Sequence, residues 1–338
     1  MSFHVTVQPS GRQFEVNEEE SILQAALREG IGLPYGCRSG ACGSCKGKVL
    51  QGKVNHRTYQ SSALTEEDLN QGKALFCCAM PLGDLIIEAR EVSGFKEMQI
   101  KKLPCRVESL ERPNRDVVVL KLKLPANEKF DFMAGQYIDF LLKDGKRRSF
   151  SLANSPHDAA LLELHIRHYP GGSFSEFVFS ELKERAILRF EGPLGAFVLR
   201  EDSDKPMIFM AGATGFAPIK GLIEYAHHKE LARPMTLYWG VQSKADLYQI
   251  QIVEDWLMTI PNFTFVPVLS NPLPEDGWTG RTGLVHQAVL DDFSDLSGYQ
   301  VYACGASRMV EAGFNAFIEQ RGLPEHEFYS DPFVPSGT

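Results

Sequence analysis

Four cysteines near the start of the chain have the number and spacing of a metal-cluster site. They are Cys37, Cys42, Cys45 and Cys77, which gives the pattern C-x4-C-x2-C with a distant fourth cysteine. Four thiolates at this spacing are typical of a cluster of two irons and two sulfides. Small residues separate the first three cysteines, so backbone N–H groups can point at sulfur and tune the reduction potential. We predict a 2Fe-2S cluster held by these four residues.

Zinc is the main alternative for a group of four cysteines. Zinc motifs usually pair two C-x2-C elements, whereas this chain has the x4 spacing and a single distant ligand. Cys77 and Cys78 are adjacent, so only one of them is expected to bind iron. The segment 75–81 resembles the ferredoxin segment in which the earlier cysteine is the ligand, which leaves Cys78 as a buried filler. Residues 1–92 as a whole resemble a plant-type ferredoxin with the β-grasp fold.

A second motif with chemical potential is Arg148-Ser149-Phe150-Ser151. Such a tetrad alone is often an exposed strand end. Here it resembles the R-x-Y-S/T motif of the ferredoxin-NADP reductase superfamily, and the resemblance extends over residues 103–338. It implies that Arg148 pairs with the FAD pyrophosphate, which a forked guanidinium suits, that Phe150 packs on the flavin, and that Ser151 reaches flavin N5. Phe150 replaces the usual tyrosine, so stacking is kept and a hydroxyl hydrogen bond is lost.

A glycine-rich loop follows at residues 170–175, before an expected helix. A helix N-terminus offers free N–H groups and the positive end of a dipole, and both suit a phosphate. The loop resembles the second FAD phosphate loop of the superfamily, which implies FAD contacts from Gly172, Ser173 and Ser175. A hairpin turn without a ligand is the alternative.

A second glycine-rich turn lies at residues 211–218, between an apolar strand of the kind that is buried and a helix. Backbone amides hold a pyrophosphate in this context, although the G-x-G-x-x-G fingerprint is absent. The turn resembles the superfamily's G-G-T-G-x-A-P, with Ala213 in place of the second glycine. The resemblance implies NAD(P)H contacts from Gly212, Thr214, Gly215 and Pro218. Where NADPH enzymes often place arginine, only Lys244 is available, so the sequence favours NADH without excluding NADPH.

The C-terminal third contains two further elements of the superfamily. Cys304-Gly305 resembles the C-G pair beside the nicotinamide, although a lone buried cysteine is usually packing. The segment 329–333 resembles the acidic and aromatic ending near the flavin face. The resemblance therefore implies a catalytic group of Ser151, Cys304 and Asp331, with Gly305 and Phe333 contacting cofactor.

Three kinds of element must position these motifs. Strands at 3–7 and 13–16 and a helix at 19–29 open the chain. Short alternating runs from 105 to 199 predict a six-stranded antiparallel β-barrel, and strands alternating with helices after Pro206 predict a doubly wound parallel sheet. The predicted fold is thus multidomain, α+β and α/β. Its parts are a ferredoxin domain (1–92), a linker (93–102), an FAD-binding barrel (103–202) and an NAD(P)H-binding domain (203–338).

Composition restricts the function classes. The chain has 338 residues, a formal net charge of −8 and 43% hydrophobic residues, which excludes disorder and nucleic-acid binding by bulk positive charge. No apolar run reaches the ~18 residues of a membrane span, so we expect a cytoplasmic protein without membrane insertion. His165 and His168 fall among strand residues without evident Cys or carboxylate partners, and we expect surface positions for them.

These modules together predict an NAD(P)H-dependent oxidoreductase that passes electrons from NAD(P)H through FAD and a 2Fe-2S cluster to a partner protein. The module order resembles the reductase components of aromatic oxygenases. Segments 148–154, 211–218 and 328–336 resemble more closely the reductases that serve a dehydrase in deoxysugar synthesis. A free flavin reductase and a non-enzymatic iron-sulfur carrier are the remaining alternatives.

Overall fold

The computed structural model describes residues 2–95 and 98–334. Part of the expected linker (96–97) and the end of the segment 328–336 lie outside the described residues. The chain folds as two compact units, residues 1–99 with 194–197 and residues 100–193 with 198–338. No helix among the described residues is long and apolar enough to cross a membrane.

The first unit is built on a five-stranded mixed sheet with the order β2-β1-β7-β3-β5. Its strands are β1 (Ser2–Gln8), β2 (Gln13–Asn17), β3 (Lys46–Gln51), β5 (Lys73–Leu75) and β7 (Leu85–Glu88). A two-stranded sheet of β4 (Val54–His56) and β6 (Ala79–Pro81) and the helices α1 (Ile22–Arg28) and α2 (Glu66–Asn70) complete the unit. Helix α1 begins at Ser21, whose side chain accepts from Gln24 N–H in a capping box, and its buried face covers the sheet. This arrangement confirms the β-grasp prediction.

The second unit begins with a six-stranded antiparallel sheet of order β11-β10-β13-β8-β9-β12. Its strands are β8 (Lys101–Glu111), β9 (Val117–Lys123), β10 (Tyr137–Leu141), β11 (Arg147–Ser151), β12 (Leu162–Arg167) and β13 (Ile187–Leu194). A bridge between Leu152 and Leu164 links the two edges, which closes the predicted barrel. Helix α3 (Ser173–Ser180) packs on the barrel core through Phe174 and Val178. Lys101 and Lys102, which the sequence pattern assigns to the linker, are instead the first residues of β8.

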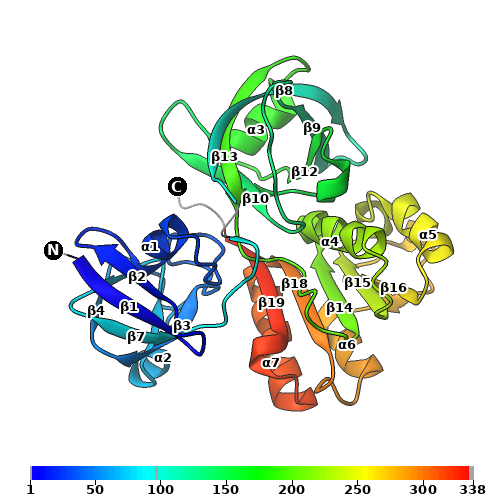
Figure 1. The fold of residues 1–338 in the computed structure, drawn as a ribbon. Coiled ribbons are helices and arrows are strands. Elements are labelled where there is room, and N and C mark those ends of the chain that lie inside the picture. Colours follow the sequence, from blue (N-terminus) through cyan, green and yellow to red (C-terminus); the bar gives the residue numbers. More distant parts are fainter. Residues whose placement is uncertain (1, 96–97, 335–338) are drawn as a thin grey trace. The chain divides into compact units, whose positions relative to one another are not determined.

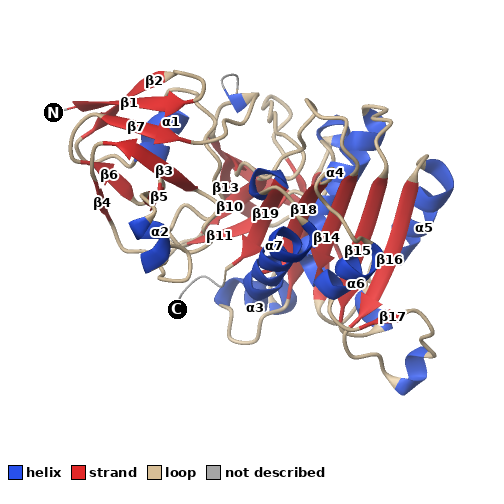
Figure 2. Ribbon diagram, turned by 90° about the horizontal axis from the view of Figure 1, so that it is seen from below, coloured by secondary structure: helices blue, strands red, loops and turns tan. Residues whose placement is uncertain are grey.

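The rest of the second unit is a parallel sheet of order β17-β16-β15-β14-β18-β19, as Figure 2 shows. Its strands are β14 (Met207–Gly212), β15 (Met235–Val241), β16 (Phe263–Leu269), β17 (Arg281–Thr282), β18 (Gln300–Ala306) and β19 (Phe328–Phe333). Helices α4 (Phe216–His228) and α5 (Ile250–Thr259) cover one face, and α6 (Val285–Asp292) and α7 (Ser307–Arg321) cover the other (Figure 1). This confirms the doubly wound prediction.

The order of the parallel strands identifies where a dinucleotide would bind. From β14 the chain moves outward to β15 and β16 and later returns to β18, which pairs with β14 on its other side. The loops that follow β14 and β18 therefore diverge at the carboxyl ends of two neighbouring strands. Ligands of open α/β sheets bind in the crevice at such a switch point.

Candidate functional site

The four predicted cluster cysteines come together in the first unit as two pairs of sulfurs. Cys45 Sγ lies 3.1 Å from Cys77 Sγ. The N–H of Cys37 donates to Cys42 Sγ at 3.3 Å, and the thiol of Cys42 also donates to Cys37. Cys37 is close enough to Cys77 to contribute electrostatically to its raised pKa. The loop between α1 and β3 and the turn between β5 and β6 thus bring all four thiols to one place.

Two pairs of thiols fit a two-iron cluster, in which each iron takes two protein ligands. Within residues 2–95 and 98–334, no group of three or more His, Cys, Asp or Glu side chains is arranged to hold a single metal ion. The N–H groups of Ser39 and Ala41 donate to Cys37 Sγ, both at 3.4 Å. With the hydrogen bond from Cys42, which is the largest contribution, these donors lower the pKa of Cys37 to about 4 and favour the thiolate that iron requires.

The cluster loop packs so closely on the residues behind it that Gly40 has no room for a side chain. A Cβ built on Gly40 would lie 2.7 Å from Cys78 Sγ, and Gly40 also has a φ of +73°. Cys78 is buried, with its sulfur 3.5 Å from Cys77 Sγ and 3.6 Å from the Thr58 carbonyl oxygen. Cys78 therefore packs behind the loop, in contact with one of the predicted ligands.

The flavin motif occupies the edge strand β11, and its alternate residues face opposite sides. Arg148 and Phe150 are half-buried on one side, and Ser151 is buried on the other. The Phe150 ring packs against Phe140 of β10 and Phe174 of α3, with centroid distances of 5.9 and 5.4 Å. Since Phe174 directly follows the Gly172-Ser173 loop, this contact brings the two predicted FAD segments together. Arg148 Nη1 donates to the Arg147 carbonyl oxygen at 2.8 Å.

The loop before α3 is held in shape by Ser175. The Ser175 hydroxyl accepts from the Tyr169 N–H at 3.1 Å and lies 3.0 Å from the carbonyl oxygens of Tyr169 and Gly172. Gly172 is the N-cap of α3 and provides no side-chain cap, so the first-turn N–H groups have no capping side chain. These N–H groups suit a phosphate, whereas the Ser175 hydroxyl is engaged within the loop itself.

The nucleotide turn packs directly against the loop after β18. A Cβ on Gly215 would overlap the Cys304 carbonyl oxygen, and a Cβ on Gly305 would lie 3.0 Å from Gly212 Cα. Only glycine permits this approach of two backbones at the switch point. Thr214 is buried beside it, and Pro218 lies in the first turn of α4, where its missing N–H has no intrahelical acceptor to lose.

Ala213 occupies a backbone conformation that normally favours glycine. Its φ is +48°, which costs an alanine about 1–2 kcal/mol relative to ordinary helical geometry. The indole N–H of Trp239 donates to the Ala213 carbonyl oxygen at 3.0 Å and holds the turn in place. The glycine expected in the superfamily is thus replaced without loss of the turn.

The three predicted catalytic residues lie on three strands, and two of them contact the carboxylate of the third. Ser151 at the end of β11 lies with its Oγ 3.0 Å from Oδ2 of Asp331 in β19, and the Cys304 sulfur in β18 lies 3.9 Å from the same oxygen. Cys304 is fully buried, and burial together with the nearby Asp331 raises the pKa of its thiol well above the usual value. Phe333 lies two residues further along β19, partly exposed, and its carbonyl oxygen accepts from Ser307 Oγ.

Carboxylates surround the position that the sequence singles out for cofactor choice. Lys244 opens a short 3-10 turn, and its N–H donates to Asp276 Oδ2 at 3.2 Å. Asp246 Oδ2 accepts from both the N–H and the hydroxyl of Ser243, at 2.9 and 3.0 Å. A single lysine is therefore accompanied by two acidic side chains.

The expected surface position of His165 is wrong. His165 is buried, its Nε2 lies 2.9 Å from Glu163 Oε1, and its Nδ1 lies 2.8 Å from the Tyr248 hydroxyl. His168 also has a carboxylate partner, Glu176, at 3.3 Å. Residues of the nucleotide-binding part cover the outer side of β12. The sequence of the strand itself does not indicate that this side is buried.

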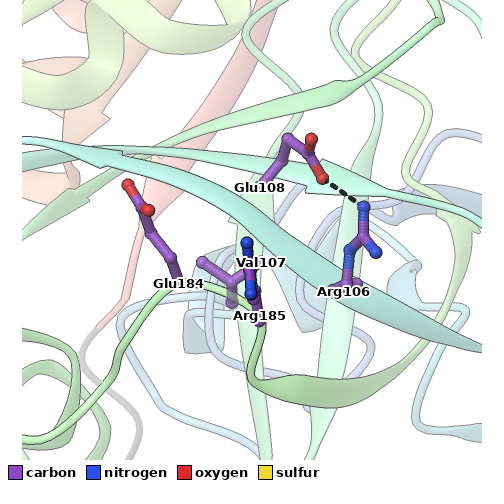
Figure 3. A pocket seen from close by; sticks show the side chains of 5 residues that line it. All are labelled: Arg106, Val107, Glu108, Glu184 and Arg185. Carbon is purple, nitrogen blue, oxygen red and sulfur yellow. Dashed lines mark hydrogen bonds and ion pairs between the residues drawn. The ribbon is translucent and has the colours of Figure 1, made fainter.

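A pocket of about 430 Å³ lies elsewhere on the barrel and contains none of the predicted site residues. It is lined by Arg106, Val107, Glu108, Glu184 and Arg185, and Figure 3 shows Arg106 paired with Glu108 at 2.8 Å. Its charged groups come from two segments, 106–108 and 184–185, and Arg106 and Glu108 neutralise each other. The pocket is thus unrelated to the flavin motif on β11.

Comparison with known protein families divides the chain into three consecutive matches. Residues 5–82 match a 2Fe-2S iron-sulfur cluster binding domain. Residues 104–199 match an oxidoreductase FAD-binding domain, and residues 209–313 match an oxidoreductase NAD-binding domain. The cluster loop, the flavin motif and the nucleotide turn each fall within the corresponding match.

Similar proteins share this organisation over their full length. The chain is 42% identical over 336 residues to the CDP-6-deoxy-L-threo-D-glycero-4-hexulose-3-dehydrase reductase of Yersinia pseudotuberculosis, covering 99% of this chain and all of that protein. It is 33% identical to the phenol hydroxylase P5 protein of Acinetobacter pittii, covering 99% and 95%. The crystal structure of the cytochrome P450 reductase GcoB from Amycolatopsis superposes with a TM-score of 0.81 at 33% identity, covering 99% of this chain and 100% of that chain.

The Yersinia and Amycolatopsis relatives are named as reductases, and the three matched domains bind an iron-sulfur cluster, FAD and NAD. The paired thiols, the aromatic contact at the flavin motif and the switch-point turn fit the same three groups. The chain therefore belongs to the ferredoxin-fused branch of the ferredoxin-NADP reductase superfamily, as an NAD(P)H-dependent iron-sulfur flavoprotein reductase with 2Fe-2S, FAD and NAD(H) as its cofactors.

Proposed function

We propose that this reductase delivers its electrons to a dehydrase that acts on a CDP-linked deoxysugar. The observation that carries the proposal is the 42% identity, over essentially the full length of both chains, to a reductase whose name specifies such a dehydrase. The reductases named for aromatic oxygenases or demethylases are 32–34% identical over the same extent. The higher identity to the dehydrase reductase favours a dehydrase as the electron acceptor.

When bound, the nicotinamide, FAD and the cluster would supply the redox chemistry, in which oxidation of one NAD(P)H to NAD(P)+ releases one proton and two electrons that reach the acceptor singly. The protein's own residues bind and orient these groups.

Cys37, Cys42, Cys45 and Cys77 are proposed as the cluster ligands. The pairing of their sulfurs and the N–H donors to Cys37 support this assignment. Cys78 packs against Cys77 without being a ligand.

Arg148 is proposed to hold the FAD pyrophosphate, with Phe150 against the flavin. The N–H groups of the first turn of α3, beginning with Ser173, are proposed to bind the second FAD phosphate. The Gly172 N–H donates to the Tyr169 carbonyl oxygen at 2.9 Å, so Gly172 is proposed to shape the loop beside the phosphate. Ser175 supports these residues, because its hydroxyl ties the loop together.

Gly212, Thr214, Gly215 and Pro218 are proposed to hold the NAD(H) pyrophosphate at the N-terminus of α4, with Gly305 forming the opposite wall. Ser151, Cys304 and Asp331 would then lie beside the reacting rings. The Asp331 carboxylate accepts a hydrogen bond from the Ser151 hydroxyl and fixes its orientation, while Cys304 remains a protonated thiol. Phe333 lies further along the same strand and is proposed to cover the flavin with its aromatic ring.

The functional parts of the chain are proposed as residues 1–92, 103–202 and 203–338, with 93–102 between the first two. The matched ranges 5–82, 104–199 and 209–313 support this division. The start of β8 at Lys101 indicates that the barrel begins two residues earlier than the linker pattern suggests.

A reconstituted turnover assay tests the acceptor. The purified reductase is mixed with NADH and either a CDP-sugar dehydrase with its substrate or the oxygenase component of a phenol hydroxylase, and NADH consumption coupled to product is measured. We expect coupled turnover at least about tenfold faster with the dehydrase. Coupled turnover with the oxygenase alone would overturn the assignment. Cytochrome c reduction, measured in parallel, verifies that the reductase itself is intact.

A further inference from the structure

We propose that a buried polar bridge between β12 and α4 is a positioning element that sets the nicotinamide turn in register with the flavin motif. The bridge comprises Tyr248, His165, Glu163 and Lys220. It rests on the proposed roles of the 212–218 turn and the 148–151 motif, and it assigns a function to residues that belong to neither.

Helix α4 packs directly on the chain segment that follows the flavin motif. A Cβ on Gly221 would meet the carbonyl oxygens of Asn154 and Leu152 at 3.1 and 3.4 Å. Since Leu152 immediately follows Ser151 and α4 begins at Phe216, one helix carries the nucleotide turn at its start and contacts the segment after the flavin strand one to two turns later. A small shift of α4 would therefore move the two sites relative to each other.

Lys220 fastens this contact with three hydrogen bonds. It is 4% exposed, and its Nζ lies 3.3 Å from the Ala153 carbonyl oxygen, 3.3 Å from Glu163 Oε1 and 2.9 Å from Glu224 Oε1. An ammonium group has three N–H donors, so each donor has one acceptor. Two of these acceptors belong to the barrel, so the lysine connects α4 to the flavin side of the protein.

His165 extends the bridge toward the adenosine side of the sheet. Its Nε2 contacts Glu163 Oε1 and its Nδ1 contacts the Tyr248 hydroxyl, which lies just before α5. Its ring also stacks on Phe216, the first residue of α4, at 6.3 Å between centroids and 21° between planes. The bridge thus contacts α4 both at its first residue and one turn further on.

An aromatic stack continues from the bridge to the strained turn. Phe216 stacks on Trp239 at 4.0 Å and 11°, and the Trp239 indole donates to the carbonyl oxygen of Ala213. Tyr248 packs edge-on against Trp239, with a centroid distance of 5.4 Å. Ala213, with its φ of +48°, is therefore held from the same side as the bridge.

The protonation states of Glu163 and His165 determine which atom donates in each hydrogen bond of the bridge. Burial acts to raise the pKa of Glu163, but the hydrogen bond from His165 and the charge of Lys220 lower it to about 2. Burial lowers the pKa of His165, which keeps it neutral near pH 7. With Glu163 ionised, His165 donates from Nε2, so its Nδ1 accepts from the Tyr248 hydroxyl. Every polar atom named in the bridge then has a partner.

The sharpest test removes one hydroxyl. Tyr248→Phe deletes the end of the bridge and keeps the ring that packs on Trp239. Tyr238→Phe is the matched control, because Tyr238 also loses one buried hydrogen bond, to Asp292 at 2.6 Å, on the α6 side of the same sheet. His165→Gln is a second bridge variant, which removes the imidazole ring that stacks on Phe216.

The holoenzyme is assayed by single-turnover flavin reduction at saturating NADH, by steady-state kinetics that give the KM for NADH, and by amide hydrogen exchange of residues 213–217. We expect Tyr248→Phe and His165→Gln to slow flavin reduction by about 10- to 100-fold, because misplacement by about 1 Å can cost 100-fold. The KM for NADH should change less than threefold, and exchange at 213–217 should rise. Tyr238→Phe should leave all three unchanged.

Equal behaviour of the bridge variants and Tyr238→Phe would overturn the proposal, as would slowed reduction without faster exchange at 213–217. Failure of the underlying site assignment has a different signature, because Gly215→Ala would then bind NADH normally. The two failures are therefore distinguishable.

Discussion

The Ser151 hydroxyl lies 3.0 Å from Oδ2 of Asp331, although 180 residues separate the two in the chain. Ser151 ends the barrel strand with the flavin motif, and Asp331 lies on the last strand of the parallel sheet, paired with Cys304. The contact therefore joins the proposed flavin and nicotinamide sites through a single hydrogen bond. It also identifies the residues whose substitution should affect catalysis with little effect on folding.

Ser151→Ala should slow flavin reduction by NADH at least about tenfold, because the proposed contact to the flavin and the hydrogen bond to Asp331 are lost together. Single-turnover absorbance at the flavin band measures the rate. Ser149→Ala is the control, since Ser149 lies on the same strand as Ser151 and its hydroxyl instead donates to Asp139 Oδ1 of β10 at 2.6 Å. Equal rates in the two variants would show that Ser151 has no special role.

Cys77→Ser should lose most of its iron and the visible absorption of the cluster, whereas Cys78→Ser should keep both. The reason is that Cys77 forms a sulfur pair with Cys45, while Cys78 lies behind the loop. Iron and sulfide analysis of both purified variants provides the measurement, with FAD content as the internal reference. Loss of iron from Cys78→Ser alone would reverse the ligand assignment.

Gly215→Ala should destabilise the second unit by about 1–3 kcal/mol and weaken NADH binding, because its new Cβ overlaps a backbone oxygen that cannot move aside. Gly298→Ala is the control, since no atom lies within 4 Å of a Cβ at that position. Thermal unfolding and NADH titration of both variants measure the effect. A Gly215→Ala protein as stable as the control would contradict the close packing at the switch point.

NADH should be preferred over NADPH, because Asp246 and Asp276 lie beside Lys244, at the position where NADPH enzymes often place arginine for the 2′-phosphate. Asp276→Asn keeps a hydrogen-bond acceptor and removes one negative charge, so it should raise kcat/KM for NADPH by roughly fivefold, which is the effect of about 1 kcal/mol of repulsion. Steady-state kinetics with both nucleotides test this. If the ratio of the kcat/KM values for the two nucleotides does not change, the 2′-phosphate of NADPH does not bind near Asp276.

The local motifs were predictable from the sequence, because each depends on residues close together in the chain. The chemistry of the four cysteines, the flavin tetrad and the glycine turn follows from their residue types and their spacing. The burial of His165 was not predictable, because the cover over β12 comes from Phe216 and Tyr248, far along the chain. The engagement of Ser175 within its own loop was equally invisible, since a serine beside glycines also suits a phosphate.

NADH should reduce the iron-sulfur cluster through the flavin within this chain. The most direct measurement is the electron paramagnetic resonance spectrum of the purified protein after anaerobic addition of NADH, in the wild-type and in Cys42→Ser. We expect the signal of a reduced 2Fe-2S cluster in the wild-type protein, and flavin bleaching without that signal in the variant. A wild-type protein whose flavin is bleached by NADH while no cluster signal develops would contradict this expectation.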